Sequence, residues 1–299
     1  VLVTPENIAK LELCRDLAPL HTGPHLMGIK GITDEMPNVP QVVVFDTAFH
    51  QTMPDYAWMY AISYDMYEKY SIRRYGAHGT SHRYVSGEMC KLLGRTEGTK
   101  IITCHIGNGS SISAVKDGKV IDTSMGFTPL DGVEMGTRCG SIDPAIVTFI
   151  MEHEGYTPAE MSDYMNKKCG MLGVSGLSSD SRDIEAAILE GNERAKLAAN
   201  ILAYEIKKYI GSYTAAMNGL DAIVFTAGMG ENNPELRERV CTDMDYYGIK
   251  LDKELNAKMH HQPNSVRLST EDSKVQVWLI PTNEELVIAT DTERIVKSL

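Results

Sequence analysis

Hydrophobic residues along the chain follow two kinds of pattern. Short β-branched runs bounded by polar or glycine-rich turns predict strands, and they lie within 41–46, 101–106, 221–226 and 275–280. Residues 111–123 alternate on either side of Asp117-Gly118, which predicts a hairpin. Apolar residues recur at every third or fourth position in 184–217, which predicts one long amphipathic helix. Strands mixed with long helices, some of the strands paired as a hairpin, indicate an α/β fold with a mixed sheet.

Two further elements are predicted near the start of the chain. A helix opens with Thr4 as its N-cap and Pro5 at its first helical position, and Pro19 closes it. The first strand ends in Asp46, which places an acid at the carboxyl end of a strand, where open α/β sheets carry their chemistry. The segment 73–85, RRYGAHGTSHRYV, is predicted to be a polar turn.

Composition and charge narrow the class of protein. The chain has 299 residues, of which 43% are hydrophobic, enough for one large or two medium domains. Its net charge of −11 argues against nucleic acid or an anionic membrane as a partner, because both select basic surfaces. Six scattered cysteines without a Cys-x-x-Cys pair are typical of reduced cytosolic thiols. No apolar run reaches the length of a membrane span, so we expect a cytoplasmic protein without a membrane partner.

Three glycine-containing turns follow predicted strands: HIGNGSS, SMGFTPLDGVEMGTRCG and FTAGMGEN. Any one of them alone is more often a turn than a ligand site. The sequence has no G-x-x-x-x-G-K-[ST] segment, and GMGENN lacks the third glycine of a dinucleotide-binding loop, which disfavours both classes of nucleotide-binding protein. What remains is a phosphate site assembled from several strand-end turns, whose backbone N–H groups and hydroxyls converge.

The turn between 101–106 and 111–123 suits such a site best. Backbone amides of Gly107, Asn108 and Gly109 can point at an anion without obstruction by side chains. This is the phosphate-hairpin arrangement of the actin-like, ribonuclease-H-like kinases. The alternative is a tight turn without a chemical role.

The chain resembles one family closely. RRYGAHGTSH, HIGNGSS, DTSMGFTPLDGVEMGTR, FTAGMGEN and PTNEEL occur in the order found in the acetate kinase family, the acetate and propionate kinases. The similarity covers essentially all 299 residues. The resemblance implies a two-domain, actin-like ATPase fold and a reversible, in-line transfer of the γ-phosphoryl group of ATP to acetate, with propionate as a further candidate. It also implies a homodimer that forms through the second domain.

The resemblance implies that the first domain is incomplete in this sequence. Residues 1–48 and 285–299 are expected to form its remnant, and 49–284 the second, nucleotide-binding domain. Members of the family begin with a strand and hairpin that carry an asparagine and a run of serines, and later supply a second arginine, which this sequence does not show. We therefore expect little or no acyl kinase activity from this chain alone. Two alternatives stay open: an acyl kinase for a longer acid such as butyrate, and a nucleotide-binding module without catalysis.

The chemistry of the reaction indicates which residues it needs. A carboxylate is already ionised at neutral pH, so the protein's task is to bring two anions together and to stabilise charge on the transferring phosphoryl group. For this the resemblance implies catalytic roles for Asp46, His78 and Arg138. It places Mg²⁺, or Mn²⁺, on Asp46 and Glu284, in keeping with a metal that takes one or two carboxylates and several waters. His82, in the same turn as His78, is expected to be structural.

The resemblance also assigns sites for the nucleotide and the acyl group. ATP or ADP is expected to bind His105, Gly107, Asn108, Gly109, Asp180, Ser181, Arg182, Gly228, Met229, Gly230 and Asn232. A helix N-cap is an alternative role for the segment around Asp180, and the two roles are compatible. The acyl pocket is expected to include Leu20, Ala77 and Pro129. Many members have phenylalanine where this chain has Ala77, and the smaller side chain leaves room for propionate.

Overall fold

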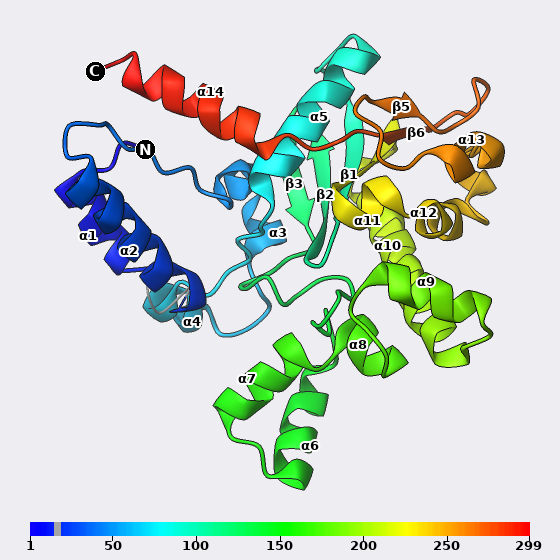
Figure 1. Cartoon of the computed structure of the whole chain (residues 1–299), viewed down its shortest axis with the longest axis horizontal. Helices are drawn as coiled ribbons and strands as arrows, with labels where there is room; N and C mark the ends of the chain where they lie inside the picture. The colour runs from blue at the N-terminus through cyan, green and yellow to red at the C-terminus, as the bar shows by residue number, and fades with distance from the viewer. Residues whose placement is uncertain (15–18) are drawn as a thin grey trace.

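A mixed β-sheet lies at the centre of the molecule (Figure 1). The computed structural model describes residues 1–14 and 19–299, with the backbone alone at 19–21. In this part of the chain the strands lie in the order β3-β2-β1-β4-β6-β5, and their bounds are β1 Lys100–Ile106, β2 Ser110–Lys116, β3 Lys119–Thr123, β4 Ala222–Thr226, β5 Val266–Arg267 and β6 Gln276–Leu279. The central strands β1, β4 and β6 are parallel, and the outer pairs are antiparallel. The predicted mixed sheet and the hairpin on Asp117-Gly118 are thus confirmed.

Helices cover both faces of the sheet and extend beyond it on two sides (Figure 1). In the described residues their bounds are α1 Pro5–Glu12, α2 Pro19–Glu35, η1 Ala48–Thr52, α3 Asp55–Trp58, α4 Tyr64–Tyr70, α5 Gly79–Leu93, α6 Pro144–Glu154, α7 Pro158–Lys167, α8 Gly170–Ser175, α9 Ser181–Leu189, α10 Glu193–Met217, α11 Ala227–Asn232, α12 Pro234–Cys241, η2 Asp245–Tyr247, α13 Lys253–Lys258 and α14 Glu284–Val296. Helix α1 begins as predicted, because Thr4 Oγ1 accepts a hydrogen bond from Asn7 N at 3.2 Å and Pro5 follows it.

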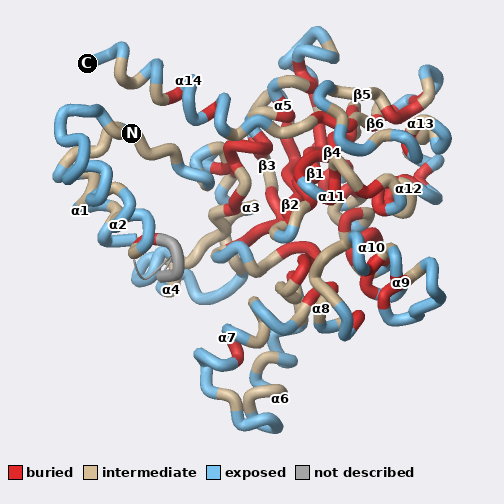
Figure 2. The backbone as a smooth tube through the Cα atoms, in the orientation of Figure 1, coloured by how far each residue is buried: buried red, intermediate tan, exposed pale blue. Residues whose placement is uncertain are grey.

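Successive residues of β1 contribute to separate cores on the two faces of the sheet. Ile102 packs in one core with Ile206 of α10, while Ile101 packs in the other with Met89 of α5. This separation follows from the alternation of side chains along a strand. Figure 2 shows the buried residues concentrated in the sheet and in the helices that cover it. The α10 face and the α5 face are therefore two independent packing surfaces, and the α5 face carries the polar residues described below.

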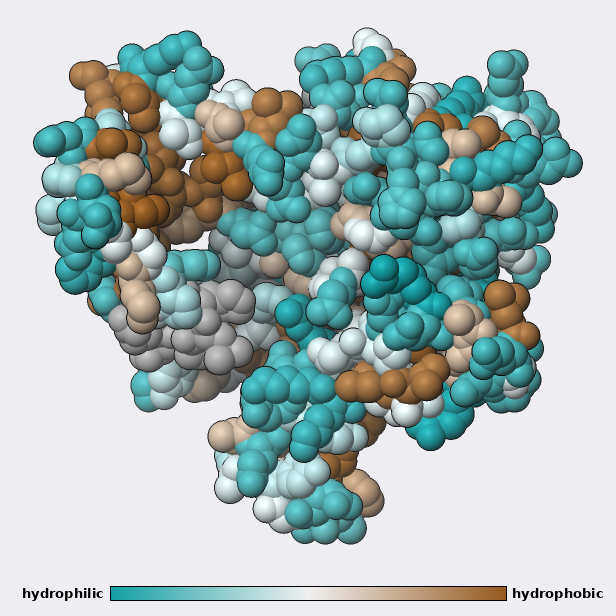
Figure 3. Space-filling view, in the orientation of Figure 1, coloured by the Kyte–Doolittle hydropathy of each residue, from teal (hydrophilic) through white to brown (hydrophobic). Residues whose placement is uncertain are grey.

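Apolar side chains are exposed on the helical pair α1–α2 and on the segment after it. These residues are Leu13, Met27, Ile32, Met36, Val39 and Phe45. Figure 3 shows hydrophobic surface, in brown, at the upper left of the molecule, where Figure 1 places α1 and α2. Within the described ranges, no helix is both long enough and apolar enough to cross a membrane.

The predicted strand at 41–46 is wrong. In the described part of the chain this segment forms an isolated bridge, between Leu2 and Val42, and is not part of the sheet. A strand needs a partner along its whole length to satisfy its backbone groups, and residues 1–3 are too short to provide one. Asp46 consequently lies in a turn and not at the end of a sheet strand.

Three predicted helix boundaries are also wrong. The long helix predicted over 184–217 is divided at Gly191, whose φ of 87° ends α9, and Asn192 then caps α10 through its side-chain oxygen. Pro19 begins α2 instead of closing a helix, because proline suits the first turn, where no N–H is needed. The predicted polar turn is shorter than expected, since α5 already starts at Gly79.

The last helix, α14, returns to the side of α5. The two helices pack together, and Arg83 Nη1 of α5 pairs with Asp291 Oδ2 of α14 at 2.6 Å. The division into 1–48 with 285–299 and 49–284 stays a prediction, as does the homodimer.

Arg237 ties α11, α12 and α13 together from a fully buried position. Its guanidinium donates to Gly230 O and Glu231 O, both at 2.9 Å, and to Asn256 Oδ1 at 2.8 Å. Burial lowers the pKa of Arg237 to about 10, so the group stays charged at neutral pH and needs all of these acceptors.

We expect Arg237→Met to lower the free energy of unfolding by about 3 kcal/mol or more, since each buried acceptor left without a donor costs about 1–3 kcal/mol. Urea unfolding followed by circular dichroism measures this change. Lys91→Met serves as the control, because Lys91 pairs with Glu88 on the exposed side of α5. Equal unfolding midpoints for the two variants would contradict the role given to Arg237.

Candidate functional site

The turn Gly107–Gly109 joins β1 to β2 at the edge of the sheet where β1 and β4 end. These two strands are parallel, with His105 opposite Thr226, so the turns that follow them lie side by side. A Cβ built on Gly107 would lie 4.0 Å from Gly228 N. Two of the predicted glycine turns therefore meet at this edge.

The third glycine turn, which contains Gly136, contacts the Gly107–Gly109 turn. Gly136 N donates to Asn108 O at 3.3 Å, and a Cβ at Gly136 would collide with the Asn108 side chain. The same Cβ position lies 3.1 Å from Ser179 O, so the loop before α9 also reaches this point. The turns that the sequence predicted to converge do lie together, and glycine at 136 is what permits the approach.

His78 and Arg138 face the same open side of the Gly109 backbone. A Cβ built on Gly109 would lie 3.4 Å from His78 Nε2 and 3.4 Å from Arg138 Nη1. Arg138 Nη1 donates to Pro129 O at 3.2 Å, and none of the ion pairs among the described residues includes this guanidinium. Burial lowers the pKa of Arg138 below its ordinary value. A cation without a carboxylate partner beside an open glycine backbone is suited to an anion.

His78 belongs to a cluster of four histidines behind the Gly107–Gly109 turn. Its ring stacks on His105 with centroids 4.0 Å apart and an interplanar angle of 18°. His82 lies behind both rings, and its centroid is 5.7 Å from that of His50. Burial is the main cause that lowers the pKa of all four, to about 4 for His50 and about 3 for His105. The imidazoles are therefore neutral near pH 7.

The hydroxyls of two serines hold three of the four rings, and the His78 ring faces the space beside Gly109 (the cleft) that it shares with Arg138. His78 Nδ1 and His82 Nε2 both contact Ser111 Oγ, at 2.8 and 2.7 Å, and His105 Nδ1 contacts Ser81 Oγ at 2.8 Å. Neither these serines nor His50 is among the site residues predicted from the sequence. The sequence of β2 does contain a pattern that points to Ser111: Ser111 and Ser113 alternate with the apolar Ile112 and Ala114. In the structure this strand is almost wholly buried, so its serine hydroxyls need polar partners inside the protein.

The carboxylates of Asp46 and Glu284 meet at one hydroxyl. Thr80 Oγ1, in the first turn of α5, lies 3.3 Å from Asp46 Oδ1 and 2.8 Å from Glu284 Oε2. Asp46 Oδ2 also accepts from His78 N at 2.6 Å, and Asp46 O accepts from Gly79 N at 2.8 Å, so Asp46 holds the start of α5. The structure thus brings together the two acids that the resemblance assigned to a metal.

This pair of acids fits Mg²⁺ in the chemistry of its donors. Mg²⁺ usually takes one or two carboxylates and fills the rest of its coordination shell with water and phosphate oxygens. No group of three or more His, Cys, Asp or Glu side chains arranged for a metal occurs among residues 1–14 and 19–299. The acids therefore suit a cation that shares its shell with water or a ligand.

Asp180 acts as the N-cap of α9. The Asp180 carboxylate accepts from Arg182 N at 2.9 Å at the start of α9, with Ser181 as the first helical residue, and also from Arg182 Nε at 3.0 Å. This guanidinium lowers the pKa of Asp180 to about 2. On the loop after β4, Asn232 Nδ2 donates to Gly228 O at 2.9 Å. A second use of these groups by a nucleotide stays a prediction.

Glu231 connects α11, which directly follows β4, to the loop that follows β6. Its Oε1 accepts from Ala227 N at 2.8 Å and from Thr282 N at 3.1 Å. Ala227 has a φ of 65°, a left-handed conformation that favours glycine and that the Glu231 contact helps to hold. Met229 and Gly230, between them in α11, are buried. Met229 and Gly230 are among the predicted nucleotide-site residues, whereas Glu231 is not.

The predicted acyl-pocket residues lie in different surroundings. Ala77 is buried against Met125 and Met135. Pro129 is exposed, and its carbonyl accepts the hydrogen bond from Arg138 Nη1. The side chain of Leu20 lies outside the described residues.

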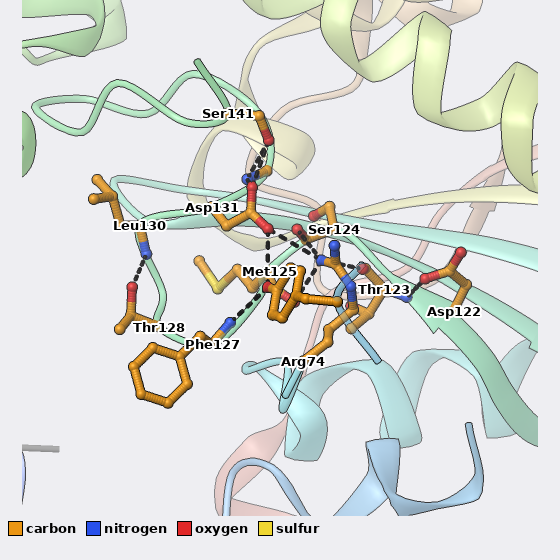
Figure 4. A network of polar contacts seen from close by, with 12 residues as sticks. Arg74, Asp122, Thr123, Ser124, Met125, Phe127, Thr128, Leu130, Asp131 and Ser141 are labelled. Atoms are coloured by element: carbon orange, nitrogen blue, oxygen red, sulfur yellow. Dashed lines mark hydrogen bonds and ion pairs between the residues drawn. The ribbon is translucent and has the colours of Figure 1, made fainter. Parts of the chain in front are cut away.

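Arg74 holds the loop that carries Pro129 and Arg138 (Figure 4). Its guanidinium pairs with Asp131 Oδ2 at 3.3 Å and donates from Nη1 to the carbonyls of Thr123, Ser124 and Met125 at 3.1, 2.9 and 3.1 Å. Sequence alone did not distinguish Arg74 from Arg73, which lies over the Trp58 ring. Arg74 thus fixes the first part of the loop on which Arg138 also lies.

Comparison with known proteins gives a consistent result. A family model described as the acetokinase family matches residues 1–290. The acetate kinase of Thermoanaerobacter pseudethanolicus is 60% identical over 301 residues, which cover 100% of this chain and 74% of that protein. The acetate kinase of Methanosarcina thermophila is 58% identical over 286 residues, which cover 95% of this chain and 69% of that protein.

Solved structures show the same likeness. Acetate kinase from Porphyromonas gingivalis matches with a TM-score of 0.95 and 53% identity, over 99% of this chain and 74% of that one. A propionate kinase from Francisella tularensis matches with a TM-score of 0.91 and 43% identity, over 97% of this chain and 73% of that one. These matches confirm the predicted fold class.

The free energy of unfolding should fall as the pH is lowered from 6.5 to about 5. Unfolded histidines bind protons with an ordinary pKa of 6.5, whereas His50 and His105 in the native protein do so only near 4 and 3. The unfolded state therefore binds more protons in this window. This part of the stability is present above pH 6.5 and is lost as the pH falls toward the native pKa values.

Urea unfolding at several pH values measures this slope. Carboxylates also contribute to it, so the informative comparison is with His105→Gln, in which the slope should be shallower. An identical slope in both proteins would show that His105 takes up its proton equally easily in the native and unfolded states.

Proposed function

This chain belongs to the acetokinase family, and we propose that its phosphoryl transfer takes place in the cleft beside Gly109. The chain is a kinase of the acetate kinase type, with a carboxyl group as the acceptor. One observation carries the placement of the site: His78 Nε2 and Arg138 Nη1 each lie 3.4 Å from the Cβ position of Gly109. A neutral ring and a fixed cation thus face one point beside a bare backbone.

In this proposal the residues act by position and charge. The acetate carboxylate is ionised without help, so none of the buried histidines has to act as a general base. Arg138 offsets the repulsion between the carboxylate and the phosphoryl group, and the amides of the Gly107–Gly109 turn contact the phosphates. His78 provides a ring nitrogen at the transferring group. Arg74 fixes the first part of the loop on which Arg138 lies.

Asp46 and Glu284 would hold the divalent cation. Mg²⁺ held there would neutralise negative charge on the nucleotide phosphates. The residues themselves do the positioning: Thr80 donates its single proton to Glu284 Oε2, the nearer carboxylate at 2.8 Å, while Asp46 is held at the start of α5 by the backbone N–H groups of His78 and Gly79. The positive end of the α5 dipole lies at the same place and favours anionic groups there.

The nucleotide would lie across the three convergent turns. Its phosphates would follow Gly107–Gly109, and its base and ribose would lie between Asp180–Arg182 and Gly228–Asn232. The closeness of Gly107 to Gly228 supports one continuous site for these groups. The open side of Gly228, where a Cβ would meet nothing within 4 Å, leaves space for a flat ring.

Arg138→Ala should lower kcat roughly 10²- to 10³-fold, because it removes the cation that stabilises the transferring group, and should leave ADP affinity largely intact. A hydroxamate assay for acyl phosphate measures turnover, and calorimetry measures ADP binding. Arg95→Ala is the matched control, since Arg95 pairs with Asp221 at the opposite end of β1.

Two outcomes would contradict this assignment. If ADP affinity collapsed together with turnover, Arg138 would belong to the nucleotide site and not to the transferring group. If the unchanged chain bound ATP and made no acyl phosphate, the prediction of little or no activity from this chain alone would be met, and the chain would be a nucleotide-binding module.

We also propose that propionate is a substrate. Ala77 is small, and its neighbours Met125 and Met135 are flexible side chains that can adapt to one more methylene. We expect kcat/KM for propionate within about tenfold of that for acetate, and a wider ratio in Ala77→Phe. The hydroxamate assay with each acid measures both values. A strong preference of the unchanged chain for acetate would reject propionate as a substrate.

A further inference from the structure

Ser111 lies between two imidazoles and can satisfy them in only two ways. Its Oγ is 2.8 Å from His78 Nδ1 and 2.7 Å from His82 Nε2. A hydroxyl has one proton, so Ser111 donates to one ring and must accept an N–H from the other. The proton positions on the two rings are therefore linked through Ser111.

The linkage continues to the far side of His82. His82 Nδ1 is 2.7 Å from Thr103 Oγ1, and Thr103 Oγ1 is 3.4 Å from Ser113 O. His82 is fully buried, and burial holds its pKa well below the ordinary value, so the ring carries one proton. The nitrogen of His82 that holds this proton determines the positions of the other protons along the contacts from Thr103 to His78.

In the first arrangement every donor points away from the cleft. Thr103 donates to Ser113 O, and His82 Nδ1 donates to Thr103. Ser111 then donates to His82 Nε2 and accepts from His78 Nδ1, which leaves His78 Nε2 without a proton. Four internal hydrogen bonds form, but the one to Ser113 O is long at 3.4 Å and contributes little.

In the second arrangement every donor points toward the cleft. Thr103 donates to His82 Nδ1, His82 Nε2 donates to Ser111, and Ser111 donates to His78 Nδ1. His78 Nε2 then carries the proton. Both arrangements hold the same four protons, one on each ring and one on each hydroxyl, so they differ in no net charge.

An anion bound in the cleft would favour the second arrangement. His78 Nε2 faces the space beside Gly109, which it shares with Arg138 Nη1. A bare Nε2 would turn a lone pair toward a phosphate oxygen, whereas a protonated Nε2 would donate a charge-assisted hydrogen bond to it. The second arrangement gives up only the long bond to Ser113 O and gains this stronger one.

We propose that the anion-bound protein carries the second arrangement, with Ser111 and His82 as positioning residues that make His78 a hydrogen-bond donor to the phosphoryl group. This inference rests on the proposed function of the cleft and adds how a neutral imidazole there comes to donate. His105 does not share this choice. Thr282 Oγ1 donates to Ser81 Oγ at 2.9 Å, which directs the Ser81 proton to His105 Nδ1.

The test reads the proton position directly. Protein labelled with ¹⁵N-histidine is examined by NMR without ligand and with ADP plus inorganic phosphate, and calorimetry of the same samples reports binding. Without ligand we expect His78 to be protonated on Nδ1. With ADP and phosphate bound we expect the proton on Nε2, the nitrogen that faces the cleft, and none on Nδ1.

Ser111→Ala should uncouple the two rings. His78 Nδ1 then has no donor, so bound phosphate should no longer give a single Nε2-protonated form, and phosphate affinity in the presence of ADP should fall about tenfold. Ser113→Ala is the matched control, because Ser113 is also fully buried in β2 and its hydroxyl contacts His50, at 3.1 Å, instead of His78. The control should keep the proton change and the affinity of the unchanged chain.

Two results on the unchanged chain would overturn the inference without any variant: His78 remaining protonated on Nδ1 when phosphate is bound, or becoming protonated on both nitrogens. A Ser111→Ala protein that behaves like Ser113→Ala would overturn it as well. If ADP and phosphate bind without perturbing His78 at all, the proposed place of the reaction fails together with the inference. Binding with a perturbed but Nδ1-protonated His78 defeats the inference alone.

Discussion

The parallel pairing of β1 with β4 brings together loops that lie far apart in the sequence. His105 stands opposite Thr226 in this register, so the Gly107 turn and the Gly228 loop leave the sheet at the same level. The Gly136 turn then closes on Asn108 from the other side. Sliding one of these strands by a residue would reverse its side chains and remove His105 from the histidine cluster. The register of two buried strands therefore controls the shape of the cleft.

Burial gives the cleft a simple charge pattern. Four histidines lie within it or behind it, and all are neutral because charging them in the interior costs too much. Arg138 supplies a fixed positive charge beside them, and Asp46 and Glu284 supply negative charge at the start of α5. A site for two anions needs this separation, since a further cation in the histidine layer would hold a product as firmly as a substrate.

The sequence predicted elements and motifs well where a local pattern decides them. The β1 strand, the Asp117-Gly118 hairpin and the convergent glycine turns were all predictable from spacing and residue type. The strand at 41–46 was not, because an apolar run becomes a strand only where a partner lies beside it. The hydroxyls of Thr80 and Ser111 were also missed, because a single polar residue acquires its role from what the fold brings within 3 Å.

Asp46 has two roles in the structure, which affects how variation at the two acids of the proposed metal site can be interpreted. Its backbone and carboxylate both hold the start of α5, and the same carboxylate shares Thr80 with Glu284. A substitution at Asp46 would therefore change foldedness and charge together, and genetics alone could not separate the two losses. Glu284 reaches α5 through the Thr80 hydroxyl, so a change there would act mainly on charge. The two acids, alike in chemistry, would tolerate mutation to different degrees during evolution.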